Sequence, residues 1–305
     1  LPYLMSKITI LFYHPRIIMT GKHLSGVTAV ALAGTLMVVL MAAGCLGSQP
    51  SGSPASPPQQ ITATGSTTVL PIAEKAREAF EDLYPSTSVL VSGGGSSVGV
   101  RAVGEGTADI GMSSRDLKPE ETGMYPGLVT HHIADDAVIL IVHPENSIES
   151  LTLDQVRGIY NGTYTNWNQV GGPDLDIVVV GRDSASGTRE FFAEYVMNKE
   201  DFTKNQEEFN SNGGVQQKVS QTPGAIGYVG LGYTDGVKPL KVVVNGDPIE
   251  PTLENITSKR YPITRPLYML TNGEPGGAVK EFLDFIMSEE GQQIVASADY
   301  IPVQG

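Results

Sequence analysis

The sequence predicts an α/β fold in which parallel sheets carry helices on both faces. From Ile61 onward, short apolar strands alternate with segments of helical periodicity, the pattern of consecutive β-α units. Residues 137–142 and 266–271 are the most continuous apolar strands, and we expect them to cross between two lobes. The 35 Gly and 20 Pro indicate many turns.

Each expected element follows from a local pattern. Strands are expected where β-branched and apolar residues form short runs bounded by Gly, Pro or Ser. The first helix has one apolar face and ends at Pro85, and the helix that begins at 152 ends at Gly162. We expect strands at 61–66, 87–93, 108–114, 136–144, 175–181, 225–233 and 265–271. We expect helices at 68–85, 96–106, 152–162, 188–197, 213–224 and 276–297, the last as one long terminal helix.

An uncharged, mostly apolar run at 24–44 follows Lys22, which is the pattern of a signal peptide. Cys45, the only cysteine of the chain, comes after small residues as in the lipobox of exported lipoproteins, although Ala42 stands where Leu is usual. The run is also just long enough to span a bilayer as an uncleaved anchor. Both alternatives place the remainder outside the membrane.

The N-terminal region therefore divides into two parts. Residues 1–44 are expected to be an N-terminal extension plus the signal peptide, and Met19 is a more natural start than Leu1. Residues 45–60 are rich in Pro and Ser and carry no charge, which is typical of a tether, here anchored by lipid on Cys45.

The net charge excludes some partners. The chain carries a formal charge of −13, with 20 Lys and Arg against 33 Asp and Glu, and no basic cluster. Such a balance disfavours nucleic acid and anionic lipid surfaces as ligands.

Four loops rich in Gly, Ser and Thr follow expected strands. In α/β sheets, ligands bind at the carboxyl ends of strands, where helices begin. Hydroxyls and backbone amides at helix N-termini suit a small oxyanion, whereas a single such loop would be explained by helix capping. The loops are TGSTTVLP (64–71), SGGGSSVG (92–99), GMSSRD (111–116) and GRDSASGTRE (181–190).

Arg182 stands at the end of an apolar strand and needs a partner if it is buried. Its planar guanidinium suits a carboxylate or a phosphate-like oxyanion. The partner is either an acidic side chain such as Asp183, or a bound anion reached together with Ser186, the Gly187 amide and Thr188.

These motifs resemble the PstS-like family of phosphate-binding lipoproteins, the substrate-binding components of phosphate ABC importers. The resemblance covers about 61–302 and rests on GSTTVLP, GGGSSVG, ADIGMSSRDL, IYNGTYTNWNQVGG, RDSASGTRE, GAIGYVGLGY and RPLYMLT. It implies a two-lobed, periplasmic-binding-protein-like fold (type II) with the ligand cleft between hinged lobes. Lobe 1 would comprise 61–137 and 263–305, and lobe 2 would comprise 138–262.

The resemblance also implies a site, partners and a location. We expect a monomeric, non-enzymatic protein at the outer face of the cell membrane, without metal or cofactor, that passes phosphate to an ABC permease and its ATPase. The expected ligand-binding residues are Ser66, Thr67, Thr68, Ser96, Ser97, Ser114, Arg182, Ser186, Gly187 and Thr188.

One position departs from the family pattern. Well-known members carry an acidic residue where this chain has Ser114, and that residue accepts the proton of hydrogen phosphate. Asp116 or Asp183 could take this role, and the sequence leaves the basis of discrimination against sulfate open.

Other functions fit the sequence less well. Gly95–Gly99 matches the nucleophile elbow G-x-S-x-G, but the histidines that follow, His131, His132 and His143, are crowded into one region, which disfavours a serine hydrolase. Adjacent histidines also make a poor metal site. Binding of sulfate, molybdate or tungstate remains the alternative, and a purely adhesive surface protein would leave the four loops unexplained.

Overall fold

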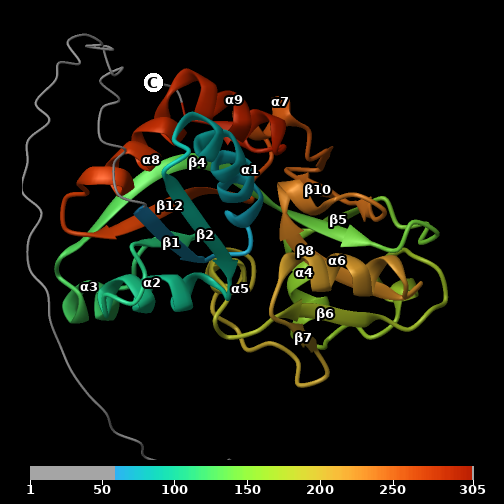
Figure 1. Ribbon diagram of the computed structural model, residues 1–305. Coiled ribbons are helices and arrows are strands. Elements are labelled where there is room, and N and C mark those ends of the chain that lie inside the picture. The colour runs from blue at the N-terminus through green and yellow to red at the C-terminus, as the bar shows by residue number, and fades with distance from the viewer. Residues whose placement is uncertain (1–58, 304–305) are drawn as a thin grey trace, which may run out of the picture. The chain divides into compact units, whose positions relative to one another are not determined.

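The computed structural model describes residues 59–303, which form a ten-stranded sheet, a three-stranded sheet and surrounding helices (Figure 1). The expected signal peptide, Cys45 and most of the tether lie outside these residues. The strands are β1 (Gln59–Gly65), β2 (Thr87–Gly93), β3 (Ile110–Ser113), β4 (Leu128–Val142), β5 (Ser150–Thr152), β6 (Val178–Arg182), β7 (Glu207–Phe209), β8 (Ala225–Gly230), β9 (Lys238–Pro239), β10 (Lys241–Val244), β11 (Asp247–Ile249), β12 (Thr264–Asn272) and β13 (Ile301–Pro302). The α-helices are α1 (Leu70–Leu83), α2 (Ser96–Gly104), α3 (Pro119–Met124), α4 (Leu153–Tyr160), α5 (Gly187–Tyr195), α6 (Asn212–Ser220), α7 (Leu253–Thr257), α8 (Gly277–Met287) and α9 (Glu289–Ser297).

The large sheet is mixed, so the expectation of parallel sheets was wrong for its centre. Its strand order is β2-β1-β3-β12-β4-β8-β6-β7. Strands pair in parallel towards either end, β1 with β2 and β3, and β6 with β7 and β8. Pairing is antiparallel where β12 meets β3 and β4, and where β4 meets β8. Strands β4 and β12 carry the chain out of one half of the sheet and back again, and therefore run in opposite directions.

Strand β4 joins the two halves, as its apolar sequence indicated. Residues 128–137 pair with β12, and residues 138–142 pair with β8. The return strand β12 begins at Thr264, which lies opposite Ala137. The apolar run predicted at 136–144 is thus the second part of a longer strand.

The buried hydrophobic residues form two separate clusters. The first core draws on residues 61–134 and 267–300, and the second core on residues 137–263. In the first core Phe80 meets Phe282 edge to face, with ring centroids 5.1 Å apart. In the second core Phe192 stacks on Tyr228 at 4.1 Å. Each core thus has its own aromatic centre.

The long terminal helix expected at 276–297 is instead two helices, α8 and α9. Ser288 between them has an extended backbone (φ −70°, ψ 167°), and its hydroxyl accepts a hydrogen bond from the Gly291 amide at 3.2 Å. This contact makes Ser288 the N-cap of a new helix. A side chain at Gly291 would collide with the backbone carbonyls of Phe285 and Ile286. Both helices contact α1 (Figure 1).

Candidate functional site

The predicted polar loops come together from the two cores. The loop before α2 belongs to the first core and the loop before α5 to the second, yet the Ser97 amide donates to the Ala185 carbonyl at 3.1 Å. Gly95 has φ 97°, and a Cβ there would collide with Ala185. A glycine at this position therefore permits the close approach of the two loops.

Arg182, at the end of β6, is 1% exposed and has no acidic partner within ion-pair distance in residues 59–303. Its Nε donates to the Phe209 carbonyl and its Nη2 to the Asn210 carbonyl and to Thr67 Oγ1, each at 3.2 Å. Its Nη1 is buried without a hydrogen-bond partner among the described residues. Burial lowers the pKa of Arg182 to about 10. The guanidinium is therefore a buried charge that an anion could neutralise.

One threonine hydroxyl contacts this guanidinium, and two others contact one another. Thr67 accepts from Arg182, and Thr68 Oγ1 lies 3.2 Å from Thr188 Oγ1, although the two residues are far apart in sequence. All three threonines are buried. Thr67 and Thr68 precede α1 in the first core, whereas Thr188 lies in the first turn of α5.

Two serine hydroxyls form a second group next to Gly187. Ser96 Oγ lies 3.3 Å from Ser114 Oγ and accepts from the Ser114 amide at 3.1 Å. Both serines are fully buried. A Cβ at Gly187 would collide with Ser96 and lie 3.0 Å from Ser114 Oγ. The absence of a side chain at this position thus lets the backbone of α5 reach both hydroxyls.

The other three predicted serines make different contacts. Ser66 Oγ accepts from the Thr68 amide, and Ser186 Oγ caps α5 by accepting from the Arg189 amide, both at 3.2 Å. Ser97 is partly exposed, and its hydroxyl accepts from Arg115 at 3.2 Å. In the described contacts, these hydroxyls stabilise the loop conformations and make no hydrogen bond to Arg182.

The sequence analysis missed three buried residues of this site: Asn212, Asp136 and Arg265. Asn212 Nδ2 donates to Thr67 Oγ1 at 3.1 Å and to Thr68 Oγ1 at 3.0 Å. Arg265 Nη2 lies 2.7 Å from Asp136 Oδ2 and donates to Thr68 Oγ1 at 3.2 Å. Opposite charges in the two apolar crossing strands were the signal that could have identified the last two.

Asp136 and Arg265 face one another across β4 and β12, and neither side chain is exposed. Burial raises the pKa of Asp136, while Arg265 and the Leu231 amide favour its ionised form. The Leu231 amide donates to Asp136 Oδ1 at 2.9 Å. The pair places a guanidinium beneath Thr68, where the chain crosses between the cores.

A group of ion pairs links the two cores beside the serines. Arg115 Nε lies 2.6 Å from Glu190 Oε2, and Lys118 Nζ lies 2.7 Å from Glu190 Oε1. Glu190 belongs to α5 of the second core, while the two cations follow β3 of the first core. Glu121 holds Arg115 in place with two hydrogen bonds of 2.7 and 2.8 Å. We call Arg115, Lys118 and Glu190 the ion triad.

Neither of the aspartates considered as proton acceptors bonds to the threonine or serine hydroxyls in the described contacts. Asp116 is exposed and accepts from the Tyr268 hydroxyl at 2.7 Å. Asp183 follows Arg182, and its Oδ1 is buried without a hydrogen-bond partner among residues 59–303.

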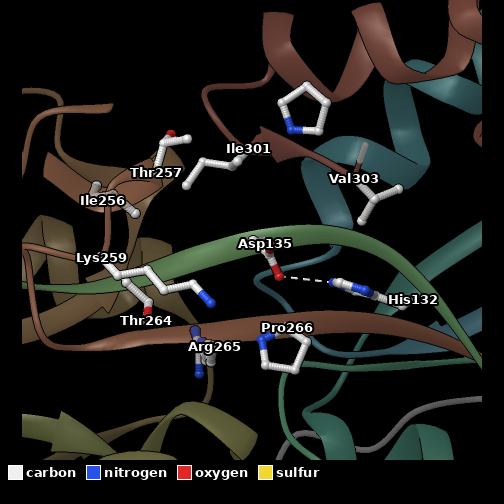
Figure 2. Close-up of a pocket in the computed structure, with 11 residues that line it drawn as sticks. His132, Asp135, Ile256, Thr257, Lys259, Thr264, Arg265, Pro266, Ile301 and Val303 are labelled. Atoms are coloured by element: carbon white, nitrogen blue, oxygen red, sulfur yellow. Dashed lines mark hydrogen bonds and ion pairs between the residues drawn. The ribbon is translucent and has the colours of Figure 1, made fainter. Parts of the chain in front are cut away.

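A cavity of about 460 Å³ lies beside the crossing strands and contains none of the predicted site residues (Figure 2). His132 and Asp135 point toward one another in it, with His132 Nε2 2.8 Å from Asp135 Oδ1. Within residues 59–303, no cluster of three or more His, Cys, Asp or Glu side chains could hold a metal ion. No helix in the same range has the length and apolar character needed to cross a bilayer.

The chain is similar to phosphate-binding proteins in sequence. Residues 52–290 match the family model of a PBP superfamily domain. The phosphate-binding protein PstS of Bacillus subtilis strain 168 is 33% identical over 244 residues, 80% of each chain. PstS of Borreliella burgdorferi is 35% identical over 253 residues, 80% of this chain and 90% of the relative.

Solved structures agree with these relatives. A structure described as a phosphate ABC transporter substrate-binding protein with bound phosphate, from Clostridium perfringens, is 40% identical and superposes with a TM-score of 0.76. An ABC-type phosphate transport receptor from Vibrio cholerae is 33% identical, with a TM-score of 0.66. Each comparison covers 80% of this chain and 100% of the other.

The hydrogen bonds to Glu121 predict an acid-dependent stability. Burial disfavours ionisation of Glu121, but hydrogen bonds from Arg115 and the Lys118 amide outweigh it and lower its pKa. A lowered folded-state pKa stabilises the fold above the ordinary value of about 4.3, and the stabilisation is lost as pH falls through the folded-state value. Glu121→Gln should therefore reduce the free energy of unfolding at neutral pH by about 1–3 kcal/mol, and by progressively less in acid.

Denaturant unfolding of both proteins between neutral pH and about pH 3 measures this difference. Glu120→Gln removes the same charge from an exposed side chain on the same helical turn and is the matched control. A Glu121→Gln deficit that is independent of pH would contradict the role of the carboxylate.

Proposed function

Because the chain belongs to the PstS family of phosphate-binding proteins, we propose that it binds inorganic phosphate outside the cytoplasm and delivers it to an ABC importer. The observation that carries the proposal is the buried Arg182 guanidinium of the second core, whose Nη1 has no partner in residues 59–303 and whose Nη2 donates to the Thr67 hydroxyl of the first core. A phosphate-like oxyanion supplies the missing charge and acceptors.

The phosphate would lie between Arg182, the Thr67, Thr68 and Thr188 hydroxyls, and the Gly187 amide. Ser96 and Ser114 would contact the phosphate on the side of α2. The remaining predicted residues, Ser66, Ser97 and Ser186, would stabilise the conformation of the binding loops. The C. perfringens relative, described with bound phosphate, supports this ligand.

Binding would act by closure of two lobes. The two cores support the division into lobe 1 (61–137 and 263–305) and lobe 2 (138–262), with β4 and β12 as the connecting strands. Phosphate favours the closed state because only closed lobes satisfy all of its oxygens. In this proposal the protein captures and releases its ligand and catalyses no reaction.

The N-terminal region would hold the protein at its site of action. Cleavage before Cys45 and lipidation of that residue would leave 45–60 as a tether to the outer face of the membrane. A monomer tethered in this way would meet the permease and ATPase subunits of an importer, which are its proposed partners.

Isothermal titration calorimetry with phosphate, sulfate and molybdate tests the ligand and Arg182 together. The wild-type protein should bind phosphate most tightly. Arg182→Met should weaken phosphate binding at least about tenfold, because hydrogen bonds to charged groups contribute about 1.5–3 kcal/mol each. Arg101→Met, the same substitution at an exposed arginine of α2, should leave affinity unchanged.

Two results would reject this assignment. Sulfate or molybdate affinity equal to or above that for phosphate would establish another oxyanion as the ligand. If Arg182→Met bound phosphate with unchanged affinity, Arg182 would not be a ligand-binding residue.

The ion triad should slow the release of phosphate. Glu190→Gln removes the charge that attracts Arg115 and Lys118 across the cleft. Partly exposed pairs contribute about 0.2–1 kcal/mol each, so losing both should raise the dissociation rate about two- to thirtyfold with little change in association rate. Stopped-flow kinetics at low and high salt measures this, since screening weakens the same pairs.

Glu194→Gln is the matched control, because Glu194 lies one turn further along α5 and pairs with Lys199 within the same core. Equal dissociation rates for wild type and Glu190→Gln at low salt would show that the ion triad does not stabilise the closed state.

A further inference from the structure

We propose that Asn212 and Arg265 are positioning residues for the ligand, which orient the Thr67 and Thr68 hydroxyls as donors. The same accounting of donors and acceptors leaves the Ser114 hydroxyl free to accept a hydrogen bond from the protonated oxygen of hydrogen phosphate. The inference rests on the proposed function, because it takes phosphate as the bound anion.

The orientation of the Asn212 side chain is fixed by its neighbours. Its Oδ1 accepts from the Gly230 amide at 3.3 Å, so its Nδ2 faces the threonines. Nδ2 then donates to Thr67 and Thr68, and the Asn212 backbone amide also donates to Thr67 Oγ1, at 3.4 Å. Asn212 is fully buried at the start of α6, in the second core.

Arg265 supplies the second fixed donor to Thr68. Its Nε and Nη2 both contact Asp136 Oδ2, at 2.8 and 2.7 Å, which holds the guanidinium in one orientation. In this orientation Nη2 also donates to Thr68 Oγ1 at 3.2 Å. A guanidinium has donors and no acceptor, so the direction of this hydrogen bond cannot reverse.

These contacts leave the Thr67 and Thr68 hydroxyls able to act only as hydrogen-bond donors. A threonine hydroxyl has one proton and two lone pairs. N–H donors from Arg182 and Asn212 occupy the lone pairs of Thr67, and N–H donors from Asn212 and Arg265 occupy those of Thr68. Both hydroxyls must therefore donate, and the acceptors available are the anion and, for Thr68, the neighbouring Thr188 hydroxyl.

The Ser96–Ser114 pair is different, because no N–H group donates to Ser114 Oγ in the described contacts. Either hydroxyl of the pair can donate to the other, and Ser96 Oγ already accepts from the Ser114 amide. If Ser114 donates to Ser96, its lone pairs are free to accept. Ser114 Oγ can therefore accept a hydrogen bond from the protonated oxygen of the ligand.

This arrangement matches the chemistry of hydrogen phosphate. Its unprotonated oxygens accept from fixed donors, and its protonated oxygen requires one acceptor. A neutral serine accepts a hydrogen bond from that oxygen without the repulsion that a carboxylate would exert on a fully ionised anion. Discrimination against sulfate should consequently be weaker than a carboxylate would give.

Calorimetry on Asn212 variants tests the orienting role. Asn212→Asp keeps the shape but replaces the Nδ2 donor with an acceptor, so the threonine hydroxyls can turn away from the anion. Phosphate affinity should fall about tenfold to a hundredfold, and further than for Asn212→Ala. In a Thr67→Val/Thr68→Val background, the additional effect of Asn212→Asp should shrink at least about threefold.

If Asn212 is only structural, or acts on the ligand by charge alone, the loss caused by Asn212→Asp will be the same in both backgrounds, and the orienting role is wrong. Failure of the wild-type protein to bind phosphate would instead reject the proposed function. Circular dichroism and thermal unfolding identify any variant that does not fold.

Ser114→Asp supplies an independent measurement. A carboxylate at this position accepts from hydrogen phosphate and repels sulfate, so the ratio of phosphate to sulfate affinity should rise at least about tenfold. Ser184→Asp adds the same charge at an exposed position of the loop before α5 and should change the ratio little. A ratio that is unchanged or lower in Ser114→Asp would show that Ser114 does not face the protonated oxygen.

Discussion

The buried guanidinium of Arg182 is the constraint on which the site depends. A charge removed from water is costly unless a partner compensates it. Backbone carbonyls and Thr67 occupy part of its hydrogen-bonding capacity, and burial lowers its pKa to about 10. An anion completes the compensation, so the same feature that would destabilise the empty protein strengthens binding of the ligand.

The position of the proposed site would link binding to closure. Arg182 belongs to the second core, whereas Thr67 and Thr68 belong to the first, so a ligand held by both requires the cores to approach. The Asp136–Arg265 pair lies where β4 and β12 cross between the cores, and it contacts Thr68 directly. The two connecting strands, the threonine hydroxyls and the Arg182 guanidinium are thus joined by one buried polar network.

The sequence predicted those parts of the fold and site that depend on local patterns. Loops with glycine and hydroxyl residues after apolar strands identified Arg182, the threonines and the serine pair, because strand ends and helix starts determine where these side chains lie. Pairing between distant strands has no local pattern, so the antiparallel centre of the sheet was missed. The break at Ser288 was missed because Ser288, a residue type that often starts helices, was expected to lie within a single helix. Asn212 and Arg265 were missed because their role arises only when distant segments meet.

A crystal structure of the protein grown with phosphate would test the central claim most directly. The account predicts one phosphate between the cores, with an oxygen within hydrogen-bond distance of Arg182 Nη1 and others at the Thr67, Thr68 and Ser114 hydroxyls. Phosphate bound elsewhere, with the Arg182 guanidinium paired instead to Asp183, would contradict it.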